Sequence, residues 1–238
     1  MTHPTERPLH APSTGSAVVV AVDGTSGSGK SSTCRAVASE LGMRYLDTGA
    51  MYRAVTWWML DQGVDVHDPA AVAARSEEPV LVSGTDPAAP TITVDGRDVS
   101  VEIRSTEVNG AVSPVAAVPE VRRRLVDLQQ AAIADAEAGP GIVVEGRDIA
   151  STVAPDAPVK IYLTADAAAR AARRAAEEGG SDVAATEASL RARDTIDSGR
   201  ATSPLTRVDG AVHVDTTSLT LAQVVEQVVA LARAAGAQ

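Results

Sequence analysis

Gly24-Thr25-Ser26-Gly27-Ser28-Gly29-Lys30-Ser31 is the stretch of sequence that decides the fold of this chain. Its spacing, G-x-x-x-x-G-K-[ST], is that of a phosphate-binding loop. The valine-rich run over residues 17–22 predicts a buried strand before it, and residues 34–41 have the spacing of an amphipathic helix that stops at Gly42. The alternative, a chance turn rich in glycine and serine, does not account for the strand and the helix on its two sides.

The residue types in this loop suit the binding of nucleotide phosphates. Its glycines let the backbone curl so that several N–H groups point at phosphate oxygens, and the following helix adds its positive N-terminal end. Lys30 would carry a charge toward the β- and γ-phosphates, and Ser31 would offer a hydroxyl to Mg²⁺. The loop alone does not separate a kinase from a GTPase, an ATPase or a transporter subunit.

Composition narrows the class of partner. The 238 residues suffice for one α/β domain with insertions or for two small domains, and the net charge of −10 argues against a general affinity for nucleic acid or an anionic membrane. No apolar run is long enough to span a bilayer, and the N-terminus lacks an apolar signal segment. We expect a cytoplasmic monomer, with residues 1–16 as a disordered tail and Cys34 as a buried structural thiol.

Strand and helix patterns alternate along most of the chain, which predicts a parallel sheet with helices on both faces, a three-layer α/β fold. Strands are predicted at 43–47, 142–145, 159–163 and 212–215. Helices are predicted from Thr48, which would cap its own helix, to Gly63, from Pro69, and over 119–137, 166–178, 184–196 and 220–235.

Residues 79–111 interrupt this alternation. Two short strands are predicted at 79–83 and 91–94, with Asp95-Gly96 as a hairpin turn and a return strand at 99–101. A helical segment over 102–112 follows. We therefore expect a β-containing subdomain at 79–111, inserted into a core made of residues 17–78 and 112–238.

Acids and arginines cluster in three places: 47–53, 145–148 and 193–200. The first two clusters follow predicted strands, and ligands of open α/β sheets bind outside the carboxyl ends of the strands, so both should share the rim of the phosphate-binding loop. Phosphoryl transfer needs several cations around the moving group. For most of the arginines at 122–124 and 170–174 a solvent-exposed helix face is the simpler interpretation, whereas Arg147, at a strand-to-loop junction, is expected to be functional.

With these clusters and the phosphate-binding loop, the chain resembles the bacterial cytidylate kinases, a family of P-loop nucleoside monophosphate kinases. The resemblance extends from about residue 18 to about residue 235. The motifs that carry the resemblance are the loop at 24–31, DTGAMYR at 47–53, EGRD at 145–148 and RDTIDSGR at 193–200, with shorter matches at 98–100, 102–104, 113–116 and 121–122. The β-containing insertion supports the same family. The resemblance implies transfer of the γ-phosphate of ATP to CMP or dCMP, with the helices at about 166–200 as a lid.

The same resemblance implies a role for each site residue. Lys30, Arg147, Arg193 and Arg200 would be catalytic, and the ATP phosphates would be held by Gly24, Gly27, Ser28, Gly29, Lys30, Ser31 and Ser32. CMP would be held by Thr48, Arg53, Ser113, Arg122, Arg147, Asp148, Arg193 and Asp197: Arg122, Arg147 and Asp148 at the base, Ser113, Arg193 and Asp197 at the sugar, and Arg53, Arg147, Arg193 and Arg200 at the phosphates. Ser31, and Glu145 through water, would hold Mg²⁺.

Two positions depart from the family pattern, and two other functions stay open. Thr48 stands where a serine is usual, so its extra methyl needs room beside the base, and Ile196 stands where some members carry arginine. One rival function is a small P-loop kinase with another acceptor. The other is a regulator that binds ATP without turnover.

Overall fold

The computed structural model describes residues 17–177, 180, 182–199 and 204–237. The predicted tail at 1–16 and the predicted catalytic residue Arg200 lie outside the described residues.

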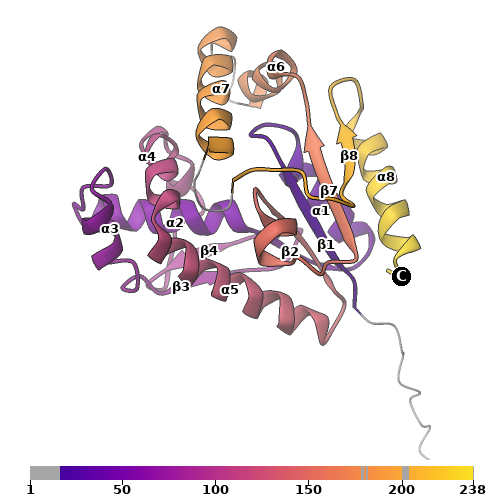
Figure 1. Cartoon of the computed structure of the whole chain (residues 1–238), viewed down its shortest axis with the longest axis horizontal. Helices are drawn as coiled ribbons and strands as arrows, with labels where there is room; N and C mark the ends of the chain where they lie inside the picture. The colour runs from indigo at the N-terminus through magenta and orange to yellow at the C-terminus, as the bar shows by residue number, and fades with distance from the viewer. Residues whose placement is uncertain (1–16, 178–179, 181, 200–203, 238) are drawn as a thin grey trace, which may run out of the picture.

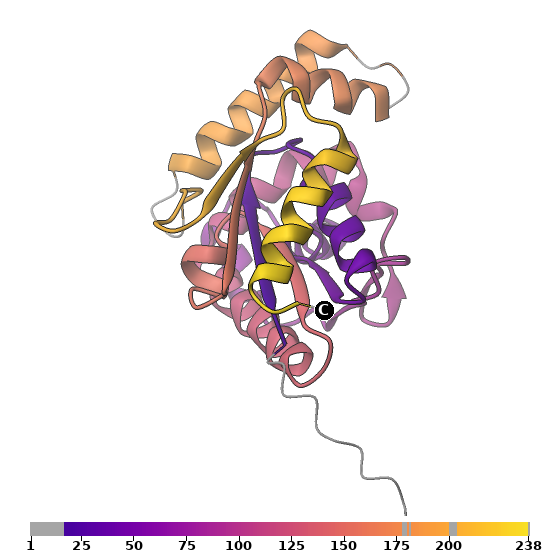
Figure 2. The same ribbon diagram turned by 90° about the vertical axis from the view of Figure 1, so that its right-hand side faces the viewer.

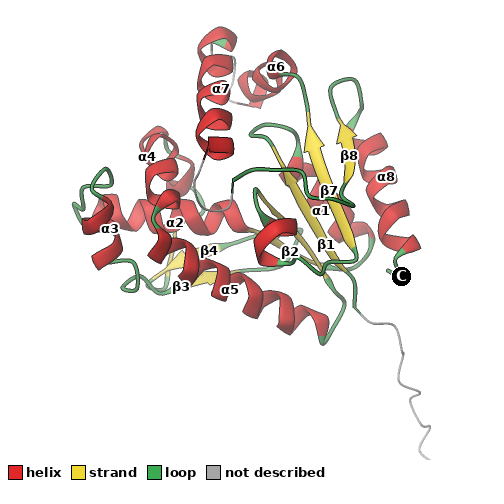
Figure 3. Cartoon of the chain, in the orientation of Figure 1, coloured by secondary structure: helices red, strands yellow, loops and turns green. Residues whose placement is uncertain are grey.

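A five-stranded parallel sheet forms the centre of the molecule (Figures 1 and 3). Its order is β2-β6-β1-β7-β8, and every pairing in it is parallel. The strands are β1 Val19–Gly24, β2 Arg44–Asp47, β6 Ile142–Gly146, β7 Val159–Thr164 and β8 Val212–Asp215. β1, which leads into the phosphate-binding loop, is therefore buried between two neighbours.

Alternate side chains of β1 face two different apolar layers. Val20 and Val22 pack with α1 (Lys30–Glu40) and α8 (Leu221–Ala234), whereas Val19 and Ala21 pack on the side of α2 (Thr48–Asp61), α4 (Thr106–Ala117) and α5 (Pro119–Glu137). Figure 2 shows α8 and α1 covering one face of the sheet. Helices thus cover both faces of the parallel sheet, and the three-layer fold is confirmed.

The inserted segment forms a second, antiparallel sheet of β3 Leu81–Ser83, β4 Ile92–Val94 and β5 Arg97–Asp98. The predicted return strand at 99–101 was wrong by two residues. Asp95 and Gly96 both have positive φ, 50° and 80°, and form a two-residue turn, so pairing resumes at once between Val94 and Arg97. Ile92 and Val94 join the apolar layer of α2, which fixes the small sheet to the core.

The helices agree with most predicted ranges, with four corrections. Asp47, not Thr48, caps α2, because its carboxylate accepts the N–H of Ala50 at 2.8 Å. The segment predicted at 102–112 is a 3₁₀ turn, Glu102–Arg104, followed by α4, which continues to Ala117. A π-helical segment, η2 Ile149–Val153, was not predicted. The remaining helices are α3 Pro69–Ala74, α6 Ala167–Glu177 and α7 Val183–Gly199, and α7 continues three residues beyond its predicted end at residue 196.

No helix among the described residues combines the length and the apolar character needed to cross a bilayer.

Candidate functional site

The phosphate-binding loop lies between the end of β1 and the start of α1, as its spacing predicts. Gly29, at the N-cap of α1, has the left-handed φ of 86°, which favours glycine. Gly24 is required for a different reason: a Cβ there would lie 2.1 Å from the carbonyl oxygen of Leu163 on β7. The outer side of the loop is held by Thr216, whose hydroxyl donates to the carbonyl of Ser28 at 3.1 Å.

Lys30 points back across the loop. Its Nζ donates to the carbonyl oxygens of Gly24 at 3.0 Å and Thr25 at 2.8 Å, and the side chain is buried. Burial, and then the positive charge of Arg147, lower the pKa of Lys30 to about 7. Its hydrogen bonds go to neutral carbonyls, and the nearby acids Glu145 and Asp23 favour its charge only in part, so an anion bound in the loop would stabilise the charged form further.

A buried acid lies below the loop at the end of β6. Glu145 accepts hydrogen bonds from the hydroxyls of Tyr45 and Ser31, and burial, followed by the charge of Asp47, raises its pKa. Among the described residues no three His, Cys, Asp or Glu side chains gather as a ready-made metal site. A hydroxyl beside one carboxylate fits Mg²⁺, which usually keeps several waters and takes further oxygens from the phosphates it accompanies.

Arg147 connects three elements. Its Nη1 donates to the carbonyl of Gly24 at 2.8 Å, and its Nε donates to Asp197 on α7 at 2.9 Å. Arg193, one turn before Asp197, is another cation near it, and burial together with the charge of Arg147 lowers its pKa. Arg147 thus lowers the pKa of a second cation that lines the same cavity, and two neighbouring cations favour an anionic ligand between them.

Arg122 and Asp148 form an ion pair that is almost fully buried, with side-chain exposures of 4% and 7%. Arg122 also donates to the carbonyl of Ala116 at 3.2 Å and lies over the ring of Tyr52, 5.6 Å from its centroid. A buried ion pair needs this kind of complete hydrogen bonding to offset its desolvation.

The expectation that most arginines at 122–124 and 170–174 are solvent-exposed was wrong. Arg124 donates to the carbonyls of Ser76 and Pro79, Arg173 to Thr216, and Arg170 to Ala165 and Ser26. Arg123 is exposed as expected. Sequence spacing alone places an arginine on a helix face but does not show which backbone carbonyls reach that face.

Three other predicted residues lie in the same part of the structure as the Arg122–Asp148 pair. Arg53 forms an ion pair with Asp47 at 3.1 Å. The hydroxyl of Thr48 donates to the carbonyl of Glu145 at 2.7 Å, so it retains only acceptor capacity toward a ligand. Ser113, on α4, is buried.

A cavity of about 410 Å³ gathers these residues. Its lining holds every predicted acceptor-binding residue that the structure describes, together with part of the loop: Ser26, Gly27, Lys30, Ser31, Thr48, Arg53, Ser113, Arg122, Glu145, Arg147, Asp148, Arg193 and Asp197. A second cavity of about 320 Å³ shares Gly27, Lys30 and Ser31 with it and adds Gly29, Ser32 and Arg35. Gly24 and Ser28 shape the loop without lining either cavity.

Asp23 is a functional candidate that the sequence analysis missed. Its buried carboxylate accepts the N–H groups of Ile149 and Ala150, both at 2.8 Å, and burial raises its pKa to about 6. It thereby connects the end of β1 to the segment directly after Arg147 and Asp148. The available signal was an acid immediately before the first glycine of the loop.

The fold and the cavity define a class of protein: a P-loop phosphotransferase with a cation-rich acceptor site. The comparisons with known proteins place it within that class. The family model for cytidylate kinase matches residues 20–234, and the chain belongs to the cytidylate kinase family.

Curated relatives are similar over nearly the whole chain. The cytidylate kinase of Streptomyces griseus subsp. griseus is 62% identical over 91% of this chain and 93% of the relative. That of Streptomyces coelicolor is 60% identical over 92% and 94%, and that of Nocardia farcinica is 54% identical over 88% and 91%. A gluconokinase structure from Sinorhizobium meliloti 1021 aligns over 92% of this chain and 94% of its own, with 19% identity and a TM-score of 0.46.

Proposed function

We propose that this protein transfers the γ-phosphate of ATP to CMP or dCMP, giving ADP and CDP or dCDP. The observation that carries the proposal is the buried Arg122–Asp148 pair in the same cavity as Lys30. Cytosine presents an exocyclic amine donor beside two acceptors, N3 and O2. A carboxylate accepts from the amine while guanidinium groups donate to the acceptors, so the pair is complementary to this base.

The residues of the cavity have separate roles in this proposal. The loop residues 24–32 bind the phosphates of ATP, and Arg53, Arg147 and Arg193 bind the acceptor phosphate and the group in transit. An oxygen of the CMP phosphate attacks the γ-phosphorus, the bond to the β–γ bridging oxygen breaks, and ADP leaves. No side chain has to form a covalent bond, because charge and position account for most of this chemistry.

Two further assignments belong to the same proposal. Ser31 and, through water, Glu145 would hold Mg²⁺, which neutralises charge on the phosphates when bound. Residues 79–111 would serve the acceptor side, α6 and α7 would act as a lid, and the protein would work as a cytoplasmic monomer, in agreement with its net charge of −10 and its one buried cysteine.

An ADP-release assay with CMP, dCMP, UMP and AMP as acceptors tests the proposal. We expect turnover with CMP and dCMP and much lower efficiency with UMP and AMP. Preference for another acceptor would support a different small P-loop kinase, and ATP binding without turnover on any acceptor would support a regulator.

A further inference from the structure

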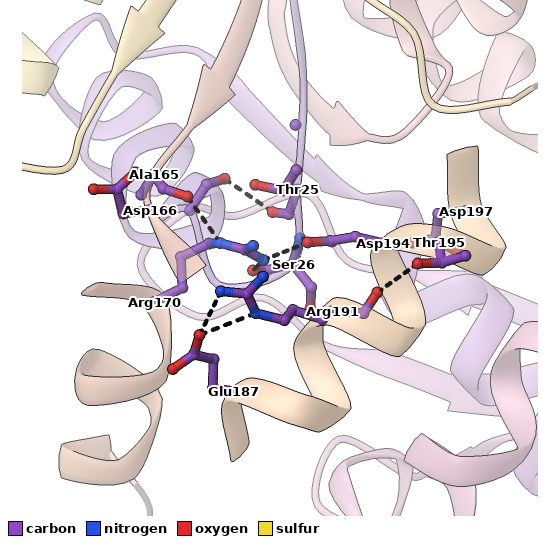
Figure 4. A network of polar contacts seen from close by, with 12 residues as sticks. Thr25, Ser26, Ala165, Asp166, Arg170, Glu187, Arg191, Asp194, Thr195 and Asp197 are labelled. Atoms are coloured by element: carbon purple, nitrogen blue, oxygen red, sulfur yellow. Dashed lines mark hydrogen bonds and ion pairs between the residues drawn. The ribbon is translucent and has the colours of Figure 1, made fainter. Parts of the chain in front are cut away.

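Ser26, at the centre of the phosphate-binding loop, is held by two side chains from other helices. Its N–H donates to Oδ1 of Asp194 on α7 at 3.3 Å, and its carbonyl accepts from Nη1 of Arg170 on α6 at 2.8 Å. The same Nη1 lies 2.7 Å from Oδ2 of Asp194. The three residues therefore form a closed ring, drawn in Figure 4, which we call the clasp.

The clasp is fixed on the side of α6 as well. Nε of Arg170 donates to the carbonyl of Ala165 at 2.9 Å, so the guanidinium is spread over three acceptors. The Arg170 and Asp194 side chains are only 6% and 18% exposed. A planar guanidinium with several donors suits this arrangement, and lysine could not reproduce it.

Figure 4 also shows a contrasting ion pair on α7, the helix that carries Asp194. Arg191 pairs with Glu187 one turn earlier at 2.7 Å, but its side chain is 67% exposed and the pair contacts no part of the loop that the structure records. Exposed ion pairs of this kind contribute little to the free energy of unfolding. It provides a matched control for the clasp.

The clasp bears on phosphate binding through the peptide that follows Ser26. The C=O and N–H of a trans peptide point in opposite directions, so holding the Ser26 carbonyl toward Arg170 also fixes the direction of the Gly27 N–H. Gly27 lines both cavities, and the Cβ of Arg170 lies 3.3 Å from where a Cβ on Gly27 would stand. The loop is thus held in shape partly by the two helices and not by its own sequence alone.

We propose that Arg170 and Asp194 are positioning residues: they set the Ser26–Gly27 peptide for the phosphates of ATP and hold α7 over the loop. The proposal rests on the proposed function, in which this loop binds ATP. The acceptor residues Arg122 and Asp148 lie outside the clasp. Arg193 and Asp197 share α7 with Asp194, but Arg147 connects this part of α7 to the loop independently of the clasp, because it donates both to Asp197 and to the Gly24 carbonyl. Loss of the clasp should therefore affect ATP much more than CMP.

The test separates positioning from stability by replacing the pair in two ways. Asp194→Leu alone leaves Arg170 as an uncompensated buried charge, so the melting temperature should fall. Combining it with Arg170→Met removes both charges, and replacing a buried pair with apolar residues restores much of the stability. Calorimetric Kd values for ATP and CMP, kcat and the melting temperature are measured for wild type, both variants, Asp194→Asn and the control Arg191→Met.

We expect the Kd for ATP to rise by about tenfold or more in the double variant, even though its melting temperature recovers, while the Kd for CMP changes by less than about twofold. Asp194→Asn keeps an acceptor for the Ser26 N–H but loses the charge, so its Kd for ATP should rise by a smaller factor. Arg191→Met should match wild type.

Recovery of ATP affinity together with the melting temperature in the double variant would overturn the proposal. If that variant does not fold, wild-type ATP affinity in Asp194→Asn would overturn it equally. Wild-type protein that binds no ATP would overturn the proposed function and the clasp together, whereas ATP binding unaffected by these changes overturns the clasp alone.

Discussion

The phosphate-binding loop takes its polar groups from one continuous stretch, residues 24–32, whereas the acceptor side of the cavity takes its groups from elements spread over the chain. Arg53 lies on α2, Arg122 on α5, Arg147 after β6, and Arg193 on α7. The charges are satisfied differently as well. Lys30 donates to neutral carbonyls, but each of Arg53, Arg122 and Arg147 already pairs with a carboxylate.

This difference teaches how each side can discriminate. Among the described residues, an ATP phosphate meets a cation whose hydrogen bonds go to backbone carbonyls and which forms no direct ion pair, although Glu145 and Asp23 lie near enough to favour its charge, so almost any triphosphate gains from it. An acceptor must instead compete with Asp47, Asp148 and Asp197 for the arginines, so only a ligand that matches the positions of those acids and arginines offsets the contacts it replaces. We therefore expect selectivity to reside on the acceptor side.

The largest expected effect is on the loop. Lys30→Ala should lower kcat by about 10³-fold, roughly 4 kcal/mol of transition-state stabilisation, because the loop loses its charged side chain while the acceptor side stays intact. Steady-state kinetics measure kcat, and a binding titration measures the affinity for CMP, which should stay at the wild-type level. Lys160→Ala, which changes the only other lysine, is the control. Loss of CMP affinity equal to the loss of kcat would show that the two sides are not separable.

Arg147 contacts both the phosphate-binding loop and the acceptor side of the cavity, so its replacement should affect both substrates. Arg147→Ala removes the hydrogen bond to the Gly24 carbonyl and the ion pair with Asp197. KM should therefore rise for both ATP and CMP, and the fall in kcat/KM should correspond to about 3 kcal/mol of lost transition-state stabilisation. Arg123→Ala, at an exposed position, should leave both constants unchanged. A change confined to one substrate would assign Arg147 to that side alone.

Asp23 links the two sides and should leave a signature in the pH dependence of stability. Its pKa is raised to about 6 in the folded protein, so the folded state holds its proton more tightly than the unfolded state, and this stabilisation is lost as pH rises from about 4 through 6. The unfolding free energy of wild type relative to Asp23→Asn should therefore fall by about 3 kcal/mol between pH 3.5 and pH 7. Denaturant titrations at several pH values measure this, with Asp61→Asn as an exposed control. A flat difference would mean that the two amide donors keep Asp23 ionised.

The smallest effect concerns Thr48, where the methyl is extra and the hydroxyl is shared with the Glu145 carbonyl. Thr48→Ser keeps the hydrogen bond, so CMP efficiency should stay within about twofold, while loss of one buried methyl lowers the unfolding free energy by about 1 kcal/mol. Thr48→Val, which keeps the shape but orphans the carbonyl, should be destabilised by more. Equal unfolding free energies for the two variants would show that the hydroxyl of Thr48 does not contribute to stability.

The same contrast explains what the sequence could predict. The loop, its strand and its helix follow from local spacing, so residues 17–42 could be predicted without any long-range information. Position at strand ends singled out the acid and arginine clusters and Arg147, but the role of each acceptor residue came from the family resemblance, because no local pattern shows that Arg122 reaches Asp148. Tertiary partners also account for the errors: Asp47 replaces Thr48 as the cap because the Thr48 hydroxyl is used by β6, and Arg170 is buried because the Ser26 and Ala165 carbonyls lie beside it.

The CMP/UMP efficiency ratio of Asp148→Asn tests the claim that the acceptor side reads the base. Uracil reverses two of the groups that cytosine presents, with an acceptor O4 and a donor N3–H, and an amide can turn its N–H₂ toward O4. We predict that CMP efficiency falls and that the ratio narrows by about 1–3 kcal/mol relative to wild type. Equal loss of CMP and UMP activity with a lowered melting temperature would contradict this, since Asp148 would then only hold Arg122 in place.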